Sequence, residues 1–138
     1  MKVSEWLMVT VFFAALITTG GSLWAQNSIV TGSWGGEHIG LLASETNAAF
    51  ELDCAHGEIN GPLVLFDQDG SFSIEGMFTL EHGGPVFPGE QPDIHPALYT
   101  GIVYDDLMEM MITLTDSGQE IGIFDLVKDR QPLLFKCL

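Results

Sequence analysis

Apolar residues recur at every second position over short stretches of this chain, and the pattern constrains the fold more than any other feature. The clearest case is Met108, Met110, Ile112 and Leu114. A period of two is typical of strands with one buried face, and beyond the N-terminal segment no sustained period of 3.6 indicates a helix. Clusters of Asn, Asp, Gly and Ser separate the stretches and favour hairpin turns. The sequence therefore predicts an all-β protein.

Seven to eight short antiparallel strands fit the pattern, and a small up-and-down barrel would bury their apolar faces. With 46% hydrophobic residues the chain can form a core, and no linker or repeat divides it. We expect a single domain over residues 26–138. The expected strands cover residues 34–42, 50–56, 59–65, 71–80, 98–104, 108–114, 121–127 and 133–138.

The N-terminal segment has the pattern of a secretory signal. An apolar run over residues 6–18 follows Lys2 and precedes Gly20, Gly21 and Ser22. This run is too short to span a bilayer, and Ala25 suits a cleavage site. We expect residues 1–25 to form a signal helix that is removed, leaving a secreted or periplasmic protein with no stable membrane insertion. The alternative is an uncleaved amphipathic or membrane anchor.

Acidic residues dominate the composition, with 19 Asp and Glu against 4 Lys and Arg, for a net charge of −15. The charge persists after cleavage, because Lys2 and Glu5 offset each other. A surface of this charge repels nucleic acid and anionic membranes and attracts cations or basic proteins. We expect a monomer. The alternative is an acidic surface that serves solubility alone.

Cys54 and Cys137 are the only two cysteines. An even number of cysteines in an exported chain favours a disulfide, which here would fix the C-terminal residues to the sheet. The alternative, a reactive or metal-binding thiol pair, lacks a C-x-x-C motif.

Three histidines are expected to gather at one end of the sheet. If the first hairpin turns at residues 45–47, His38 lies across from Cys54 and His56 lies near the first strand. The next hairpin brings His82 to the same end. Imidazole and carboxylate are ligands for zinc or copper, so His38, His56 and His82 are a candidate metal site. The alternative is that they are structural histidines paired with nearby carboxylates.

No catalytic motif accompanies these histidines, so we predict no enzyme and no catalytic residue. The alternative is a hydrolase centred on His38, His56 and Asp53, although neither an oxyanion site nor a nucleophile elbow is recognisable.

The segment 83–96 is the one long loop, and its four prolines cannot donate to a β-ladder. It carries Val86, Phe87 and Ile94, and a stiffened loop loses little entropy on binding. Residues 83–96 are therefore a candidate contact for a protein partner, as in an inhibitor of the cell envelope.

The stretch Gly32-Ser33-Trp34 resembles the G-x-W signature of lipocalin-like (calycin) barrels. This resemblance implies a calycin-like barrel whose tryptophan lies under a basic residue near the last strand, here Arg130. It also makes Trp34 a candidate ligand-binding residue, beside Phe87 of the loop.

Three further stretches resemble a family of small exported bacterial β proteins with no assigned activity. They are W-G-G-x-H at residues 34–38, D-C-A-H-G at 53–57 and L-x-K-C at 134–137. The resemblance implies a bacterial envelope or extracellular setting.

Together these features favour an exported, non-enzymatic binding protein. Its ligand would be a small molecule or a metal ion at the histidine end of the barrel. The alternatives are an envelope inhibitor acting through residues 83–96 and the hydrolase.

Overall fold

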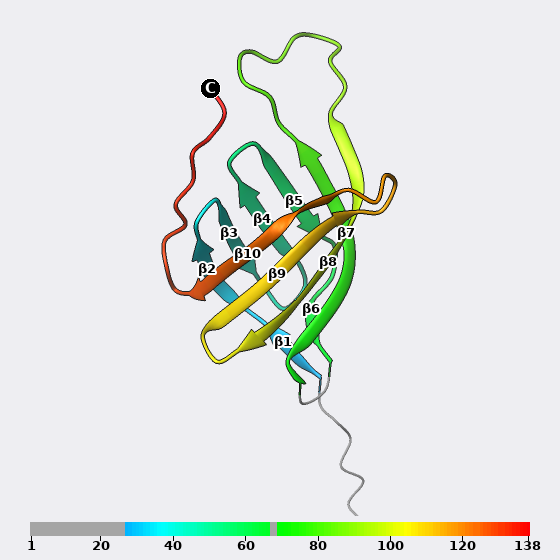
Figure 1. Ribbon diagram of the computed structural model, residues 1–138. Helices are drawn as coiled ribbons and strands as arrows, with labels where there is room; N and C mark the ends of the chain where they lie inside the picture. The colour runs from blue at the N-terminus through cyan, green and yellow to red at the C-terminus, as the bar shows by residue number, and fades with distance from the viewer. Residues whose placement is uncertain (1–26, 67–68) are drawn as a thin grey trace, which may run out of the picture.

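The computed structural model describes residues 27–66 and 69–138. The predicted signal helix, residues 1–25, lies outside this range. The described residues form a closed antiparallel barrel of eight strands in the order β10-β2-β3-β4-β5-β7-β8-β9, together with a two-stranded ribbon of β1 and β6 (Figure 1). The strands are β1 (Ser28–Val30), β2 (Gly32–Gly36), β3 (Ile39–Ala43), β4 (Ala48–Leu52), β5 (Ala55–Ile59), β6 (Leu63–Leu65), β7 (Ser71–Leu80), β8 (Asp93–Tyr104), β9 (Leu107–Leu114) and β10 (Glu120–Lys128).

Each barrel strand pairs with its neighbour in the chain once β6 is set aside, so the topology is up-and-down. The barrel closes where β10 pairs with β2, which brings Lys128 opposite Trp34 and Leu126 opposite Gly36. The predicted all-β fold and the closed antiparallel barrel are therefore confirmed. No helix among the described residues is long and apolar enough to cross a membrane.

Apolar side chains fill the inside of the barrel. The predicted alternation of β9 is confirmed, because Met108, Met110, Ile112 and Leu114 are all buried. Across the barrel the rings of Phe50 and Tyr99 stack with their centroids 4.7 Å apart. The Tyr99 hydroxyl donates a hydrogen bond to the carbonyl of Met77 at 2.7 Å. The interior is thus a packed core, as is typical of barrels of this size.

The prediction of a single strand over residues 34–42 is wrong, because these residues form a hairpin. β2 and β3 pair directly, and Glu37 and His38 form the turn. His38 has a φ of 68°, in the left-handed region that some two-residue turns use at their second position. Two turn residues shift the alternation, so Leu42 points outward and is 66% exposed.

The predicted strand 50–56 is also a hairpin, with its turn at Asp53 and Cys54 between β4 and β5. Ala55 and Ile59 are buried, whereas His56 lies on the outer face. A single strand over residues 50–56 would place His56 on the same face as Phe50, and that placement is wrong.

The ribbon of β1 and β6 was not expected. Ser28 pairs with Leu65 and Val30 pairs with Leu63, and these last two side chains are buried. The predicted strand 59–65 is thus divided. Its first residue ends β5 in the barrel, and its last three form β6 in the ribbon.

The predicted strand 133–138 is absent from the structure. We call residues 129–138 the tail. It follows the outside of the barrel, and its only ladder contact among the described residues is a parallel bridge from Leu133 to Glu37 (Figure 1). The long loop is also shorter than expected, because β8 begins at Asp93 and includes Pro96. We call residues 81–92 the projecting loop.

Candidate functional site

The turns Glu37–His38 and Asp53–Cys54, the projecting loop and the turn at residues 115–119 all lie at one end of the barrel, together with the end of the tail (Figure 1). We call it the disulfide end. The described residues include all four histidines of the sequence, and each lies here in contact with at least one carboxylate.

The tail is held at this end by covalent and polar contacts. Cys54 and Cys137 form the predicted disulfide, with their Cα atoms 5.3 Å apart. The N–H of Cys137 donates to the carbonyl of Asp53 at 3.2 Å, and the N–H of Phe135 donates to the Asp53 carboxylate at 2.7 Å. The Lys136 ammonium donates to the carbonyl of Leu52 at 2.9 Å. These contacts replace the strand pairing that the tail lacks.

His38 pairs with the carboxylate that holds the tail. Its Nδ1 lies 2.6 Å from Oδ2 of Asp53, and its Nε2 lies 3.5 Å from Glu37. The pKa of Asp53 is lowered from its usual value by the Phe135 N–H and then by His38, against an opposing effect of burial. Asp53 is therefore a charged anchor for both the β2–β3 turn and the tail.

His56 belongs to a second pair on the outer face of β5. Its Nδ1 lies 2.9 Å from Oε1 of Glu81, and the other oxygen of Glu81 accepts a hydrogen bond from Lys136 at 3.0 Å. The pKa of Glu81 is lowered by Lys136 first and by His56 next, which together outweigh burial. Glu81 therefore links the base of the projecting loop to the tail.

The tip of the projecting loop is a tight turn. The N–H of Glu90 donates to the carbonyl of Phe87 at 3.1 Å, across Pro88 and Gly89. Gly89 has a φ of 85°, and proline followed by a glycine of positive φ is the signature of a type II turn. A second hydrogen bond closes the turn, because the Phe87 N–H donates to the Glu90 carboxylate at 3.0 Å. The tip is therefore closed by both backbone and side chain.

His82 connects this turn to the barrel. Its Nε2 contacts Oε1 of Glu90, and its Nδ1 donates to the carbonyl of Gly83 at 2.9 Å. The Gly83 carbonyl and Glu90 raise the pKa of His82. The Phe87 N–H and His82 lower the pKa of Glu90. Both shifts favour the ion pair, so His82 and Glu90 form a clamp across the projecting loop.

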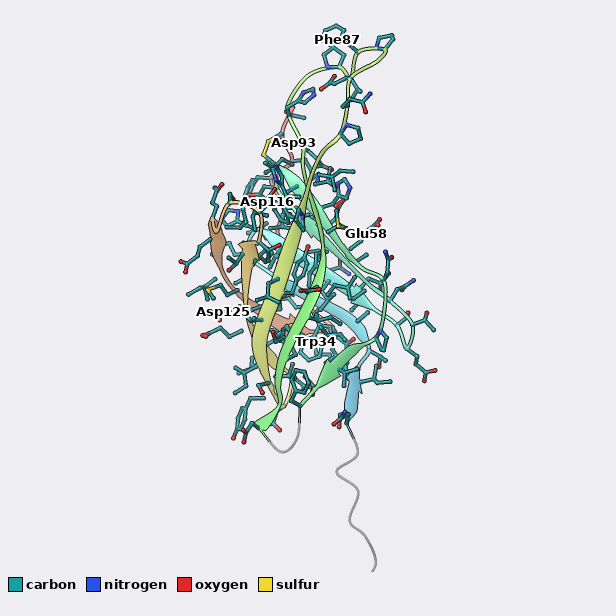
Figure 2. All side chains as sticks on the ribbon, turned by 90° about the vertical axis from the view of Figure 1, so that its right-hand side faces the viewer. Trp34, Glu58, Phe87, Asp93, Asp116 and Asp125 are labelled. Atoms are coloured by element: carbon teal, nitrogen blue, oxygen red, sulfur yellow. A yellow bond between two sulfur atoms is a disulfide. The ribbon has the colours of Figure 1, made fainter. Side chains whose placement is uncertain are left out.

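His95 is a fourth histidine that the sequence analysis did not single out. Its Nδ1 lies 2.7 Å from Asp116 and its Nε2 lies 2.9 Å from Asp93. Asp93 and Asp116 lie just below the projecting loop (Figure 2). The hydrogen bond to Asp116 is the main cause that raises the pKa of His95. Asp93 and His95 are two residues apart in a strand, and this spacing on one face was the available signal.

The structure brings His38, His56 and His82 to the same end, as expected, but pairs each with a different carboxylate. Over residues 27–66 and 69–138, no three or more His, Cys, Asp or Glu side chains are grouped so that they could hold a metal ion. The zinc or copper site stays a prediction without support from this geometry. In the hydrolase alternative, Asp53 contacts His38 and Glu81 contacts His56, so the three proposed residues do not form one relay.

The two candidate ligand-binding residues differ in exposure. Trp34 is buried in the barrel, and its indole N–H donates to the carbonyl of Thr31 at 3.2 Å. A basic residue does lie over its ring, but it is Lys128 rather than the predicted Arg130. Phe87 is 67% exposed and Val86 is 76% exposed, and Phe87 lies at the outermost point of the projecting loop (Figure 2). Only Phe87 is available to a partner.

No family model, curated protein or solved structure matches this chain. The functional argument therefore depends on the geometry of the disulfide end itself.

Proposed function

We propose that this protein is an exported, non-enzymatic protein-binding module that inserts its projecting loop into a positively charged partner protein. The observation that carries the proposal is the rigid tip, which presents two exposed apolar side chains, Val86 and Phe87, beyond the end of the barrel. An exposed aromatic anchor on a preorganised loop is typical of protein-binding hot spots.

The base of the loop supports the same conclusion. A Cβ at Gly83 would collide with the carbonyl of Leu138, so the loop and the tail lie in direct contact. The disulfide then fixes the tail to the β4–β5 turn. The contacts of Glu81 and His82 continue this support to the tip. The loop therefore has little freedom to lose when a partner binds.

Charge favours a basic partner. The net charge of −15 would accelerate association with a cationic surface, and added salt would slow it. The packed interior gives less support to the other proposal, a small ligand inside a calycin-like barrel. The calycin-like shape itself is supported by the position of Trp34 beneath Lys128, close to the barrel closure.

The proposal is tested with a photo-crosslinking amino acid at position 87, in protein recovered after export of the full-length chain. The crosslinked partner is identified, purified and titrated against wild type, Phe87→Ala and Tyr104→Ala. Tyr104 is a matched control because it is an aromatic residue, 72% exposed, at the opposite end of the barrel.

We expect Phe87→Ala to weaken binding at least tenfold, which is the usual effect of losing a hot-spot aromatic residue, about 2 kcal/mol. Tyr104→Ala should leave the affinity unchanged. The proposal would be contradicted if both variants lost the same amount of affinity, or if both bound the partner as tightly as wild type.

A further inference from the structure

The course of the tail creates a hollow on the outer face of the barrel, away from the projecting loop. The tail lies directly on the β2–β3 hairpin because that surface is made of glycine. A Cβ at Gly35 would collide with the backbone of Arg130, and a Cβ at Gly40 would lie 3.0 Å from the ring of Pro132. The tail therefore forms a raised wall of Pro132 and Leu134 beside the outer face of β3, β4 and β5.

The hollow has a volume of about 480 Å³, within the range of pockets that hold small molecules. Ala49 lines the hollow, and its small side chain points outward from β4. Ala49 pairs with Leu42 on one neighbouring strand and with Glu58 on the other. Cross-strand neighbours on one face lie side by side, so an exposed leucine and an exposed carboxylate flank the hollow.

The carboxylates around the hollow differ in their partners. Glu51 lies 3.7 Å from the Lys136 ammonium, which also contacts Glu81. No lysine, arginine or histidine among the described residues forms an ion pair with Glu58. Glu58 is therefore a negative charge without a cation beside an apolar surface, on a protein of net charge −15.

We propose that this hollow binds a small organic cation with an apolar body. The ammonium group pairs with Glu58, and the apolar body covers Leu42, Ala49 and Leu134. Apolar contact alone would admit neutral molecules equally well, whereas Glu58 selects for positive charge and repels anions. The hollow lies on the sides of the barrel strands, so this inference does not depend on the projecting loop.

The test uses three probes with the same phenyl body: phenethylammonium, 2-phenylethanol and 3-phenylpropionate. Each is titrated into ¹⁵N-labelled protein recovered after export of the full-length chain, and amide shifts are followed by NMR. We expect saturable shifts around residues 42, 49, 58 and 134 with phenethylammonium. The alcohol should bind at least tenfold more weakly, and the carboxylate should not bind at all.

Two variants localise the site. Ala49→Trp should fill the hollow and abolish the shifts. Glu58→Gln should lower the affinity for phenethylammonium to that for 2-phenylethanol. Glu109→Gln is the matched control, because Glu109 is an exposed glutamate on the outer face of β9. Thermal melts establish that each variant is folded, and Glu58→Gln keeps the test decisive if Ala49→Trp does not fold.

The proposal is overturned if the amine and the alcohol bind equally, if the shifts cluster elsewhere, or if none saturates. It is also overturned if Glu109→Gln weakens binding as much as Glu58→Gln does. If the protein captures no partner through Phe87 but still binds the amine, only the proposed function is contradicted. If it captures a partner through Phe87 but does not bind the amine, only this inference is contradicted.

Discussion

The carboxylate of Asp53 accepts a hydrogen bond from the backbone N–H of Phe135, although 82 residues separate them. Beside it, the disulfide joins Cys54 to Cys137. Both contacts leave the same two-residue turn between β4 and β5, so one turn holds the end of a tail that has no strand of its own. The tail in turn supports the projecting loop at Gly83.

Replacing both cysteines by serine should lower the free energy of unfolding by about 4.5 kcal/mol at 25 °C, as the chain-entropy model gives for a separation of 83 residues. Urea unfolding of wild type and of Cys54→Ser/Cys137→Ser under oxidising conditions measures the difference. Reducing agent should bring wild type to the level of the double variant. Equal stability of the two oxidised proteins would contradict the prediction.

Stability should decline as the pH rises above 6.5. The pKa values of His82 and His95 lie above their ordinary value of 6.5 in the folded protein. Their stabilising contribution is therefore complete below pH 6.5 and is lost as the pH rises through the folded-state pKa values. The partners Glu90 and Asp116 have lowered pKa values, so their contribution is lost only in acid.

Histidine titrations by NMR and thermal melts from pH 5.5 to 8.5 check this pH dependence. In His95→Gln the decline in melting temperature above pH 6.5 should become shallower. A melting temperature that rises across this interval in wild type would show that the signs of the shifts are wrong.

Gly57→Ala should be strongly destabilising. A Cβ at Gly57 would collide with the Tyr99 hydroxyl in the buried core, and forcing such overlap costs about 1–3 kcal/mol. Gly61→Ala is the control, because a Cβ there meets open space and should change stability by about 0.5 kcal/mol or less. Denaturant unfolding measures both variants.

The same collision predicts a coupling between the two residues. Tyr99→Phe alone removes the hydroxyl that bonds to Met77 and should cost about 1 kcal/mol or more. In Gly57→Ala/Tyr99→Phe the colliding oxygen is gone, so the double variant should lose less stability than the sum of the single variants. Strict additivity would argue against the collision.

Lys128→Ala should destabilise the barrel closure, whereas Arg130→Ala should have little effect. The Lys128 Nζ lies 5.9 Å from the centroid of the Trp34 ring, and an exposed cation over an aromatic ring contributes about 0.5–1 kcal/mol. Tryptophan fluorescence during urea unfolding compares the two variants. A larger loss of stability in Arg130→Ala than in Lys128→Ala would favour Arg130, the residue predicted from the sequence, as the cation over Trp34.

The architecture could be predicted because β9 and β7 carry a clear alternation of apolar and polar residues. Two hairpins escaped prediction because their turns, Glu37–His38 and Asp53–Cys54, have none of the usual Asn-Gly or Asp-Gly signals. Glycine has no side chain to mark a face, so Gly36 and Gly40 continued an apparent alternation through the first of these turns. Each missed turn reversed the assignment of faces that followed it.

The candidate site could be predicted less well. The disulfide was predicted from the cysteine count and the expected export, and the gathering of the histidines was predicted from the hairpin at residues 45–47. The pairing of the histidines with carboxylates could not be predicted, because it depends on the face of the sheet to which each side chain points. The hollow around Ala49 could not be found from sequence, since Pro132 and Leu134 reach it through a tail that follows no periodic pattern.

The pairing of β10 with β2 has a consequence for encounters between molecules. A barrel closed in this way has no edge strand, because each of its eight strands has a neighbour on both sides, so no strand offers a free edge along its whole length to which another chain could add a strand. Within the part of the chain that the structure describes, unpaired backbone remains on short stretches, among them the ribbon of β1 and β6 and the side of residues 72–76 of β7 that faces β5. This architecture therefore resists uncontrolled β-aggregation at high concentration and leaves recognition to side chains and loops.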